Sequence, residues 1–129
     1  MNIPKELKYS KDHEWVKVEG NVAIIGVTDF AQSQLGDVVF VELPDELSTV
    51  KVGDSFSVIE SVKAVSDIYA PVSGKIVKVN QALTDSPDLI NQEPYGEGWI
   101  VVIEMSDSSE LDDLLDSDAY AQLAAEGGH

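Results

Sequence analysis

The chain has 129 residues, of which 43% are hydrophobic, and its 24 acidic residues outnumber the eight Lys and Arg residues to give a net charge of −16. We expect one domain over residues 1–129, with a core at about 9–105 and a helical tail at about 107–125. The absence of cysteine excludes disulfides, thiol nucleophiles and thiolate metal sites. The charge disfavours nucleic acid and anionic membranes as partners, and self-repulsion favours a monomer.

The first predicted element is a β-hairpin. Residues 13–18 and 22–27 are rich in strand-forming side chains and flank a turn that contains Gly20 and Asn21. A short helix follows, because Thr28 suits an N-cap, Phe30 and Leu35 have helical spacing, and Gly36 suits a helix end.

Short strands continue along the chain. The sequence predicts strands at 37–43, 56–61, 65–70, 75–80 and 99–105, with loops around the prolines between them. The last run is apolar at nearly every position, which predicts a strand buried on both faces. Strands at this spacing indicate a mainly β protein, either a sandwich or a small barrel. We expect Trp15, Phe40, Tyr95 and Trp99 to pack in or at the edge of the core.

The tail changes character after residue 105. Capping pairs such as Asp107 with Glu110 predict a helix start. The leucines at 111, 114, 115 and 123 then form an apolar stripe at helical spacing, so we expect one or two helices packed on the sandwich.

One predicted hairpin has an unusual tip. The strands at 56–61 and 65–70 are joined by a short link centred on Lys63, without the Asn-Gly or Asp-Gly pair that tight hairpin turns favour. A turn without positive φ angles, such as type I, is therefore expected. Because Lys63 is flanked by Val62, Ala64 and Val65, the residues of this tip suit recognition by an enzyme that acylates the amine. The alternative is an ordinary exposed lysine.

The residues around Lys63 resemble those of a known superfamily. ESVKA at 60–64, followed by APVSG at 70–74, is similar to the attachment segment of biotinyl and lipoyl carriers, and the absence of methionine beside Lys63 favours lipoate over biotin. Three further segments, HEW at 13–15, GVTDFAQ at 26–32 and LGDVVFVELP at 35–44, narrow the resemblance to the glycine cleavage H-protein family. Leu89-Ile90-Asn91, Pro94-Tyr95, Gly98-Trp99 and the acidic tail extend it over nearly the whole chain.

This resemblance implies a flattened β-barrel/sandwich hybrid of the lipoyl-domain (hammerhead) type, with a short helix in its N-terminal half and C-terminal helices. It implies a non-catalytic carrier with lipoate on Lys63. Its partners would be a pyridoxal-phosphate glycine decarboxylase, a tetrahydrofolate-dependent aminomethyltransferase, an FAD- and NAD-dependent dihydrolipoyl dehydrogenase, and lipoate-attaching enzymes. The last would read Glu60 and Gly74.

The resemblance also implies a cleft that protects the loaded arm, formed with Asp12, Glu14 and Asp67, whose carboxylates could hold a protonated amine. Because the N-terminus resembles no presequence, we expect a bacterial cytoplasmic location rather than the mitochondrial matrix.

Other functions remain as alternatives. The sequence has no arginine, no Gly-x-Ser-x-Gly elbow, no phosphate loop and no metal-ligand cluster, which argues against an enzyme. His13 is interpreted as a structural residue. The remaining candidates are a biotin carrier, a lipoyl domain of a 2-oxoacid dehydrogenase, and an interaction module in which Lys63 is never modified.

Overall fold

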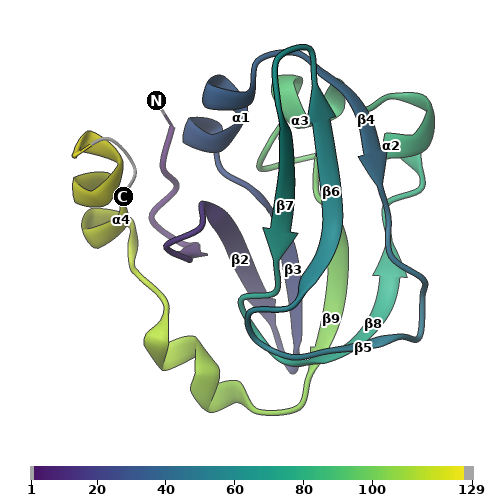
Figure 1. Cartoon of the computed structure of the whole chain (residues 1–129). Helices are drawn as coiled ribbons and strands as arrows, with labels where there is room; N and C mark the ends of the chain where they lie inside the picture. The colour runs from purple at the N-terminus through teal and green to yellow at the C-terminus, as the bar shows by residue number, and fades with distance from the viewer. Residues whose placement is uncertain (1, 127–129) are drawn as a thin grey trace.

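Two antiparallel sheets form most of the computed structural model, which describes residues 2–126 (Figure 1). The larger sheet has the strand order β1-β2-β3-β9-β8-β5, and the smaller has the order β4-β6-β7. The strands are β1 (Lys8–Tyr9), β2 (Glu14–Glu19), β3 (Val22–Val27), β4 (Val38–Glu42), β5 (Thr49–Val50), β6 (Ser55–Ser61), β7 (Val65–Tyr69), β8 (Gly74–Val79) and β9 (Val101–Met105). The mainly β sandwich is confirmed, and its sheets do not close into a barrel.

The predicted hairpins and the first helix are confirmed. Strands β2 and β3 pair from Glu14 with Val27 to Glu19 with Val22, so only Gly20 and Asn21 form the loop. Helix α1 (Asp29–Leu35) begins after Thr28, whose side chain accepts a hydrogen bond from the backbone N of Ala31. It ends at Gly36, which has a φ of 76°.

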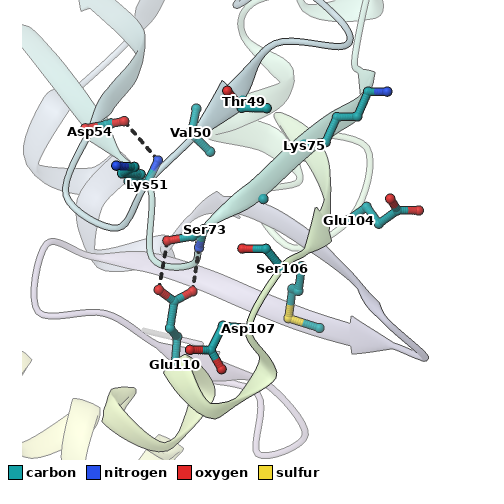
Figure 2. Close-up of a pocket in the computed structure, with 12 residues that line it drawn as sticks. Thr49, Val50, Lys51, Asp54, Ser73, Lys75, Glu104, Ser106, Asp107 and Glu110 are labelled. Atoms are coloured by element: carbon teal, nitrogen blue, oxygen red, sulfur yellow. Dashed lines mark hydrogen bonds between the residues drawn. The ribbon is translucent and has the colours of Figure 1, made fainter.

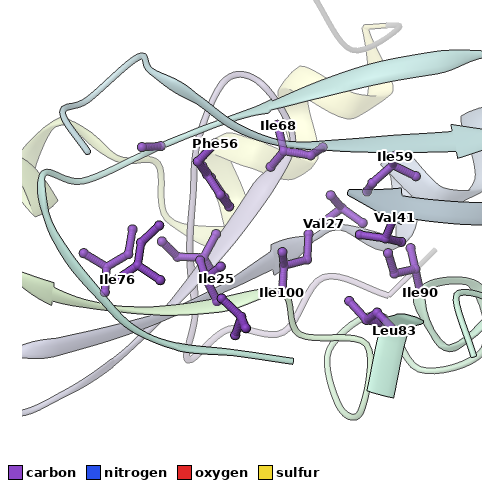
Figure 3. Packing of buried hydrophobic residues seen from close by; sticks show 14 of the residues in the cluster. Ile25, Val27, Val41, Phe56, Ile59, Ile68, Ile76, Leu83, Ile90 and Ile100 are labelled. Atoms are coloured by element: carbon purple, nitrogen blue, oxygen red, sulfur yellow. The ribbon is translucent and has the colours of Figure 1, made fainter. Parts of the chain in front are cut away.

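The main core lies between the two sheets. Figure 3 shows Ile25 and Ile76 of the large sheet and Phe56, Ile59 and Ile68 of the small sheet converging on one buried cluster. A second cluster lies at the side of the sandwich, where α4 (Ser117–Ala125) packs beside the N-terminal segment (Figure 1). Its buried members are Leu7, Tyr9, Trp15, Phe30, Tyr120 and Ala124.

Three sequence predictions are corrected by this arrangement. The residues 81–98 are not simply a loop, because they form α2 (Ala82–Asp85) and α3 (Leu89–Gln92). Strand β9 is not buried on both faces, since Val101 and Ile103 are buried while Glu104 is exposed. Phe40 is 48% exposed rather than packed in the core, because a register shift between Val38 and Phe40 in β4 turns its side chain outward.

The tail is helical, but it is not one continuous stripe. A 3₁₀-helix (Ser108–Asp113) is capped by Asp107, and α4 is capped by Asp116. The extended segment between them lets Leu115 bond with Tyr9, so the stripe is interrupted and Tyr120 and Ala124 become the buried residues of α4. No helix within residues 2–126 is long and apolar enough to cross a membrane.

Candidate functional site

Lys63 lies exposed at the tip of the β6–β7 hairpin. The backbone N of Ser61 donates to the carbonyl of Ala64 at 2.8 Å, while the Ser61 hydroxyl accepts hydrogen bonds from the backbone N of Lys63 at 3.3 Å and of Ala64 at 3.0 Å. No tip residue has a positive φ, as predicted. The turn nevertheless has its own stabilising side chain, Ser61, in place of the Asn-Gly or Asp-Gly pair.

The stem of Lys63 rests on the end of α1. A Cβ built on Gly36 would lie 3.3 Å from Cε of Lys63, so the glycine leaves room for the chain. Asn91 of α3 fixes the end of α1. Its side-chain NH2 group donates a hydrogen bond to the carbonyl of Gly36 at 2.8 Å, and its Oδ1 accepts one from the backbone N of Val38 at 2.8 Å. The only ion pair among residues 2–126 joins Lys17 and Glu19, which leaves the Lys63 amine outside any salt bridge there.

A cavity of about 350 Å³ lies beside this tip. It runs between α1, the turn that precedes β2, and the inner side of β7. Its walls are mostly apolar, with Asp12 and His13 at one side and Ala64, the neighbour of Lys63, at the other. The lining residues are Asp12, His13, Val27, Phe30, Ala31, Gln34, Leu35, Ala64, Val65, Ser66 and Ile68, and together they define the arm cleft.

The three acids expected at this cleft are not brought together. Asp12 lines the arm cleft, whereas Asp67 does not. Successive side chains of a strand point to opposite faces, so Ser66 and Ile68 of β7 face the cleft while Asp67 faces outward and accepts a hydrogen bond from Ser55 at 3.2 Å. The position of Asp67 therefore does not support a role inside the cleft.

Glu14 lies inside the protein, with a relative exposure of 1%. Its carboxylate accepts hydrogen bonds from the Ser10 hydroxyl at 2.5 Å and from the backbone N of Tyr69 at 3.3 Å. Burial raises its pKa to about 7, against the lowering effect of these two hydrogen bonds. Glu14 is thus a buried acid that exchanges its proton near neutral pH, close to the turn that carries Asp12.

Glu60 and Gly74, the expected recognition residues, occupy different ends of the hairpin. Glu60 pairs with Val65 beside the tip. Gly74 begins β8, beyond the far end of β7 (Figure 1), where a Cβ would lie 2.0 Å from the carbonyl oxygen of Glu104. The close approach of the β9 backbone therefore requires glycine at 74 whatever an attaching enzyme reads there.

A larger cavity, of about 680 Å³, lies at that opposite end (Figure 2). The carboxylate of Glu110 accepts from the backbone N of Ser73 at 2.7 Å and from its hydroxyl at 2.8 Å, and Asp54 accepts from the backbone N of Lys51. We refer to it as the distal cavity, after its lining residues Thr49, Val50, Lys51, Asp54, Ser73, Gly74, Lys75, Glu104, Met105, Ser106, Asp107 and Glu110. Three of its acids, Asp54, Asp107 and Glu110, accept hydrogen bonds that hold nearby turns.

Sequence reasoning proposed Lys63 as the site, but it did not identify the residues that support this lysine in the structure. Ser61 and Asn91 appeared in the sequence only as members of family motifs. The partners of Ser61 lie within the tip, whereas those of Asn91 lie at the end of α1 and the start of β4. A serine two residues before a hairpin tip is a usable signal for a side-chain-capped turn. Nothing local in the sequence shows that Asn91 would contact residues 53 and 55 positions earlier.

The fold is a β-sandwich, and it presents an exposed lysine at a hairpin tip next to a cleft. This arrangement defines a carrier domain of the lipoyl type. The sequence model described as Glycine cleavage H-protein matches residues 7–127. The chain belongs to that family. Its members are lipoyl carriers in glycine cleavage and are not catalytic enzymes, and this is the role of the chain.

Individual relatives agree over nearly their full lengths. The chain is 60% identical to the glycine cleavage system H protein of Symbiobacterium thermophilum, with 98% of both chains covered. It is 56% identical to that of Carboxydothermus hydrogenoformans, over 98% of this chain and 97% of the relative. The crystal structure of a glycine cleavage system H protein from Mycobacterium marinum superposes with a TM-score of 0.88 at 40% identity, covering 95% of this chain and 99% of that one.

Proposed function

We propose that Lys63 is joined to lipoate through an amide. On this proposal the chain carries an aminomethyl group from a pyridoxal-phosphate glycine decarboxylase to a tetrahydrofolate-dependent aminomethyltransferase, and a dihydrolipoyl dehydrogenase then reoxidises the arm. The observation that carries the proposal is the position of Lys63, which is exposed, makes no ion pair with the residues that the structure describes, and lies at a turn whose hydrogen bonds do not involve its side chain.

The surroundings of Lys63 fit a long, mostly apolar arm. Gly36 leaves space along the lysine stem, and the arm cleft of about 350 Å³ starts at the neighbouring residue, Ala64. Lipoate would supply a ring disulfide whose sulfur takes up and releases the carried group. The chain contributes a fixed attachment point, and the tether raises the local concentration of that sulfur at a docked enzyme.

Within the cleft, we assign the recognition of a protonated amine first to Asp12, which lines it, and then to Glu14, which lies behind the same turn. Both are linked to the Ser10 hydroxyl, since it accepts hydrogen bonds from the backbone N of Asp12 at 3.2 Å and of Glu14 at 3.1 Å. A cation held near Glu14 would lower the pKa of this acid and favour its ionised form. Asp67 is left out of this assignment because it faces the other side of β7.

The outer face around the tip suits docking by enzymes. Phe40 pairs with Glu60, which pairs with Val65, and the exposed fractions of Val62 and Val65 are 68% and 67%. Contiguous exposed apolar side chains commonly mark interaction sites. With a net charge of −16, this face would meet partners whose active-site entrances combine apolar and basic residues. The attaching enzyme would read Glu60 here, three residues before Lys63.

Mass spectrometry of the chain, expressed in bacteria supplied with lipoate, tests the proposal. Acylation of Lys63 blocks trypsin there, so we expect a peptide spanning 52–75 that carries a lipoyl increment. A biotinyl increment would favour a biotin carrier, and an unmodified Lys63 would favour a plain interaction module; either result would overturn the proposal. The bacterial relatives support a cytoplasmic site for this chemistry.

A further inference from the structure

His13 forms one wall of the arm cleft in an unusual backbone conformation. Its φ is 69°, and Leu47 is the only other non-glycine residue within 2–126 with a positive φ. Such a conformation is disfavoured for a residue with a Cβ and persists where its surroundings fix it. Here the carbonyl of His13 accepts a hydrogen bond from the backbone N of Thr28 at 3.1 Å, and its ring lies 4.9 Å from that of Phe30, which also lines the cleft.

The imidazole of His13 is held by the C-terminal helix, none of whose residues lines the cleft. The hydroxyl of Tyr120, a fully buried residue of α4, lies 2.7 Å from Nδ1 of His13. The two rings also meet edge to face, with centroids 5.6 Å apart. A hydrogen bond and a ring contact together restrict the imidazole to one orientation.

The same hydroxyl reaches the start of α1. It lies 2.7 Å from the hydroxyl oxygen of Thr28, which caps α1 by accepting from the backbone N of Ala31 at 3.1 Å. A hydroxyl can donate one hydrogen bond and accept others, so Tyr120 can join both neighbours in one chain. Thus a residue from near the C-terminus connects the two elements that line one side of the cleft, the 12–13 turn and α1.

Tyr9 provides a comparison within the same cluster. Its ring stacks on that of Tyr120 at 4.7 Å and is equally buried, yet its hydroxyl donates to the carbonyl of Pro4. A buried tyrosine therefore finds a hydrogen-bond partner here without contacting the cleft wall. Packing alone accounts for both rings, but it does not account for the link from the Tyr120 hydroxyl to His13 and Thr28.

We propose that Tyr120 is a positioning residue for the arm cleft, and that α4 contributes to the protection of the carried group by fixing His13 and the start of α1. This inference rests on the proposed function, because it needs an arm that enters the cleft. It gives the C-terminal helix a part in carriage, although none of the residues that line the arm cleft belongs to it.

The test compares Tyr120→Phe with Tyr9→Phe. Each variant loses one buried hydroxyl from the same stacked pair, so a purely structural effect would be similar in both. In lipoylated protein loaded with the aminomethyl group, we expect Tyr120→Phe to release the group about threefold to tenfold faster, as for loss of one hydrogen bond. Tyr9→Phe should release it at the rate of the unchanged chain.

A second readout does not depend on the arm. In the unmodified chain, the ring resonances of His13, assigned with the help of His129→Ala, should shift and broaden in Tyr120→Phe and remain unchanged in Tyr9→Phe. Unchanged resonances and release in Tyr120→Phe, or equal acceleration in both variants, would overturn the inference.

The failure of the proposed function would look different. If lipoylation and loading leave the backbone resonances of Val27 and Ala31, which line the cleft far from Lys63 in the chain, unshifted in the otherwise unchanged chain, then no arm occupies the cleft, and both the cleft proposal and the role of Tyr120 are overturned. If those resonances shift but Tyr120→Phe has no effect on release, only the role of Tyr120 is overturned.

Discussion

The two ends of the sandwich contain cavities that differ in what their polar groups do. At the distal cavity, which is about twice as large, Glu110 and Asp54 are bonded to the backbone of Ser73 and Lys51. At the arm cleft, the walls are mostly apolar and the neighbouring amine of Lys63 makes no ion pair with the described residues. One end uses its acids to hold turns, and the other presents a reactive group.

On the proposed function the smaller cavity is the one that serves carriage, and cavity size would then be a poor guide to function in this protein. Both carboxylate oxygens of Glu110 accept hydrogen bonds from Ser73, so this acid is committed to holding that turn. An exposed amine on a braced turn can be modified without loss of structure. The following three substitutions test this division of roles, in order of decreasing expected effect.

Replacing Lys63 by alanine should abolish modification and carriage completely while leaving stability within about 0.5 kcal/mol, because an exposed side chain buries little surface. Intact mass, glycine–bicarbonate exchange with the partner enzymes, and thermal unfolding are the measurements. Lys75→Ala, which removes an exposed lysine beside the distal cavity, is the matched control and should keep the full lipoyl increment. Persistent exchange activity in Lys63→Ala would contradict the proposed attachment site.

Replacing Gly74 by alanine should destabilise the fold by about 3 kcal/mol, the upper end of the usual cost of overpacking, since the new Cβ would lie 2.0 Å from the carbonyl oxygen of Glu104 and strands β8 and β9 would have to separate. Urea unfolding measures the loss. At a temperature where the variant is still folded, we expect lipoylation of Lys63 to continue.

Gly96→Ala is the control for this substitution, because its nearest neighbour would be the flexible end of the Glu93 side chain at 3.1 Å. We expect it to cost less than about 1 kcal/mol. A fully stable but unlipoylated Gly74→Ala protein would instead show that Gly74 is read by the attaching enzyme.

Replacing Glu14 by glutamine should change how stability depends on pH. The folded pKa of about 7 lies above the ordinary value of 4.5, so the protonated carboxyl favours the folded state, and its contribution is complete below pH 4.5 and lost as pH rises through 7. Between pH 5 and pH 8 this amounts to about 2 to 3 kcal/mol. The free energy of unfolding of Glu14→Gln, relative to the unchanged chain, should therefore rise over this interval.

Urea titrations at pH 5, 6, 7 and 8 measure this dependence. The unchanged chain, measured at the same four pH values, is the reference. Parallel stability curves for Glu14→Gln and the unchanged chain would show that the Glu14 carboxyl is ionised throughout this interval.

Local signals in the sequence predicted the parts of the fold that depend on local interactions. The cap formed by Thr28, the stop at Gly36 and the two-residue loop at Gly20 and Asn21 each involve neighbours within a few positions. Strands β1 and β5 were missed because two residues are too few to show an alternating pattern. Phe40 was misplaced because a bulge in β4 breaks the alternation on which the prediction depends.

The part of the candidate site that lies in a local sequence motif could be predicted. The part that depends on contacts between residues far apart in the chain could not. Lys63 could be identified from its neighbours in the chain. The bonds from Tyr120 to His13 and Thr28 span 107 and 92 residues, and no periodicity in the sequence encodes them. Asp67 was grouped with Asp12 from the resemblance alone, and only the pleat of β7 shows that its carboxylate points to the other face.

The turn capped by Ser61 has a consequence for how a loaded and an empty carrier could be told apart. Since every bond that shapes the tip comes from Ser61 and the main chain, acylating the amine removes a charge without breaking any of them. The scaffold would keep one shape through each stage of loading and discharge. An enzyme that binds this scaffold must therefore distinguish loaded from empty carrier by contacts with the arm and the cleft. The hairpin provides only the binding position, because it is the same in both states.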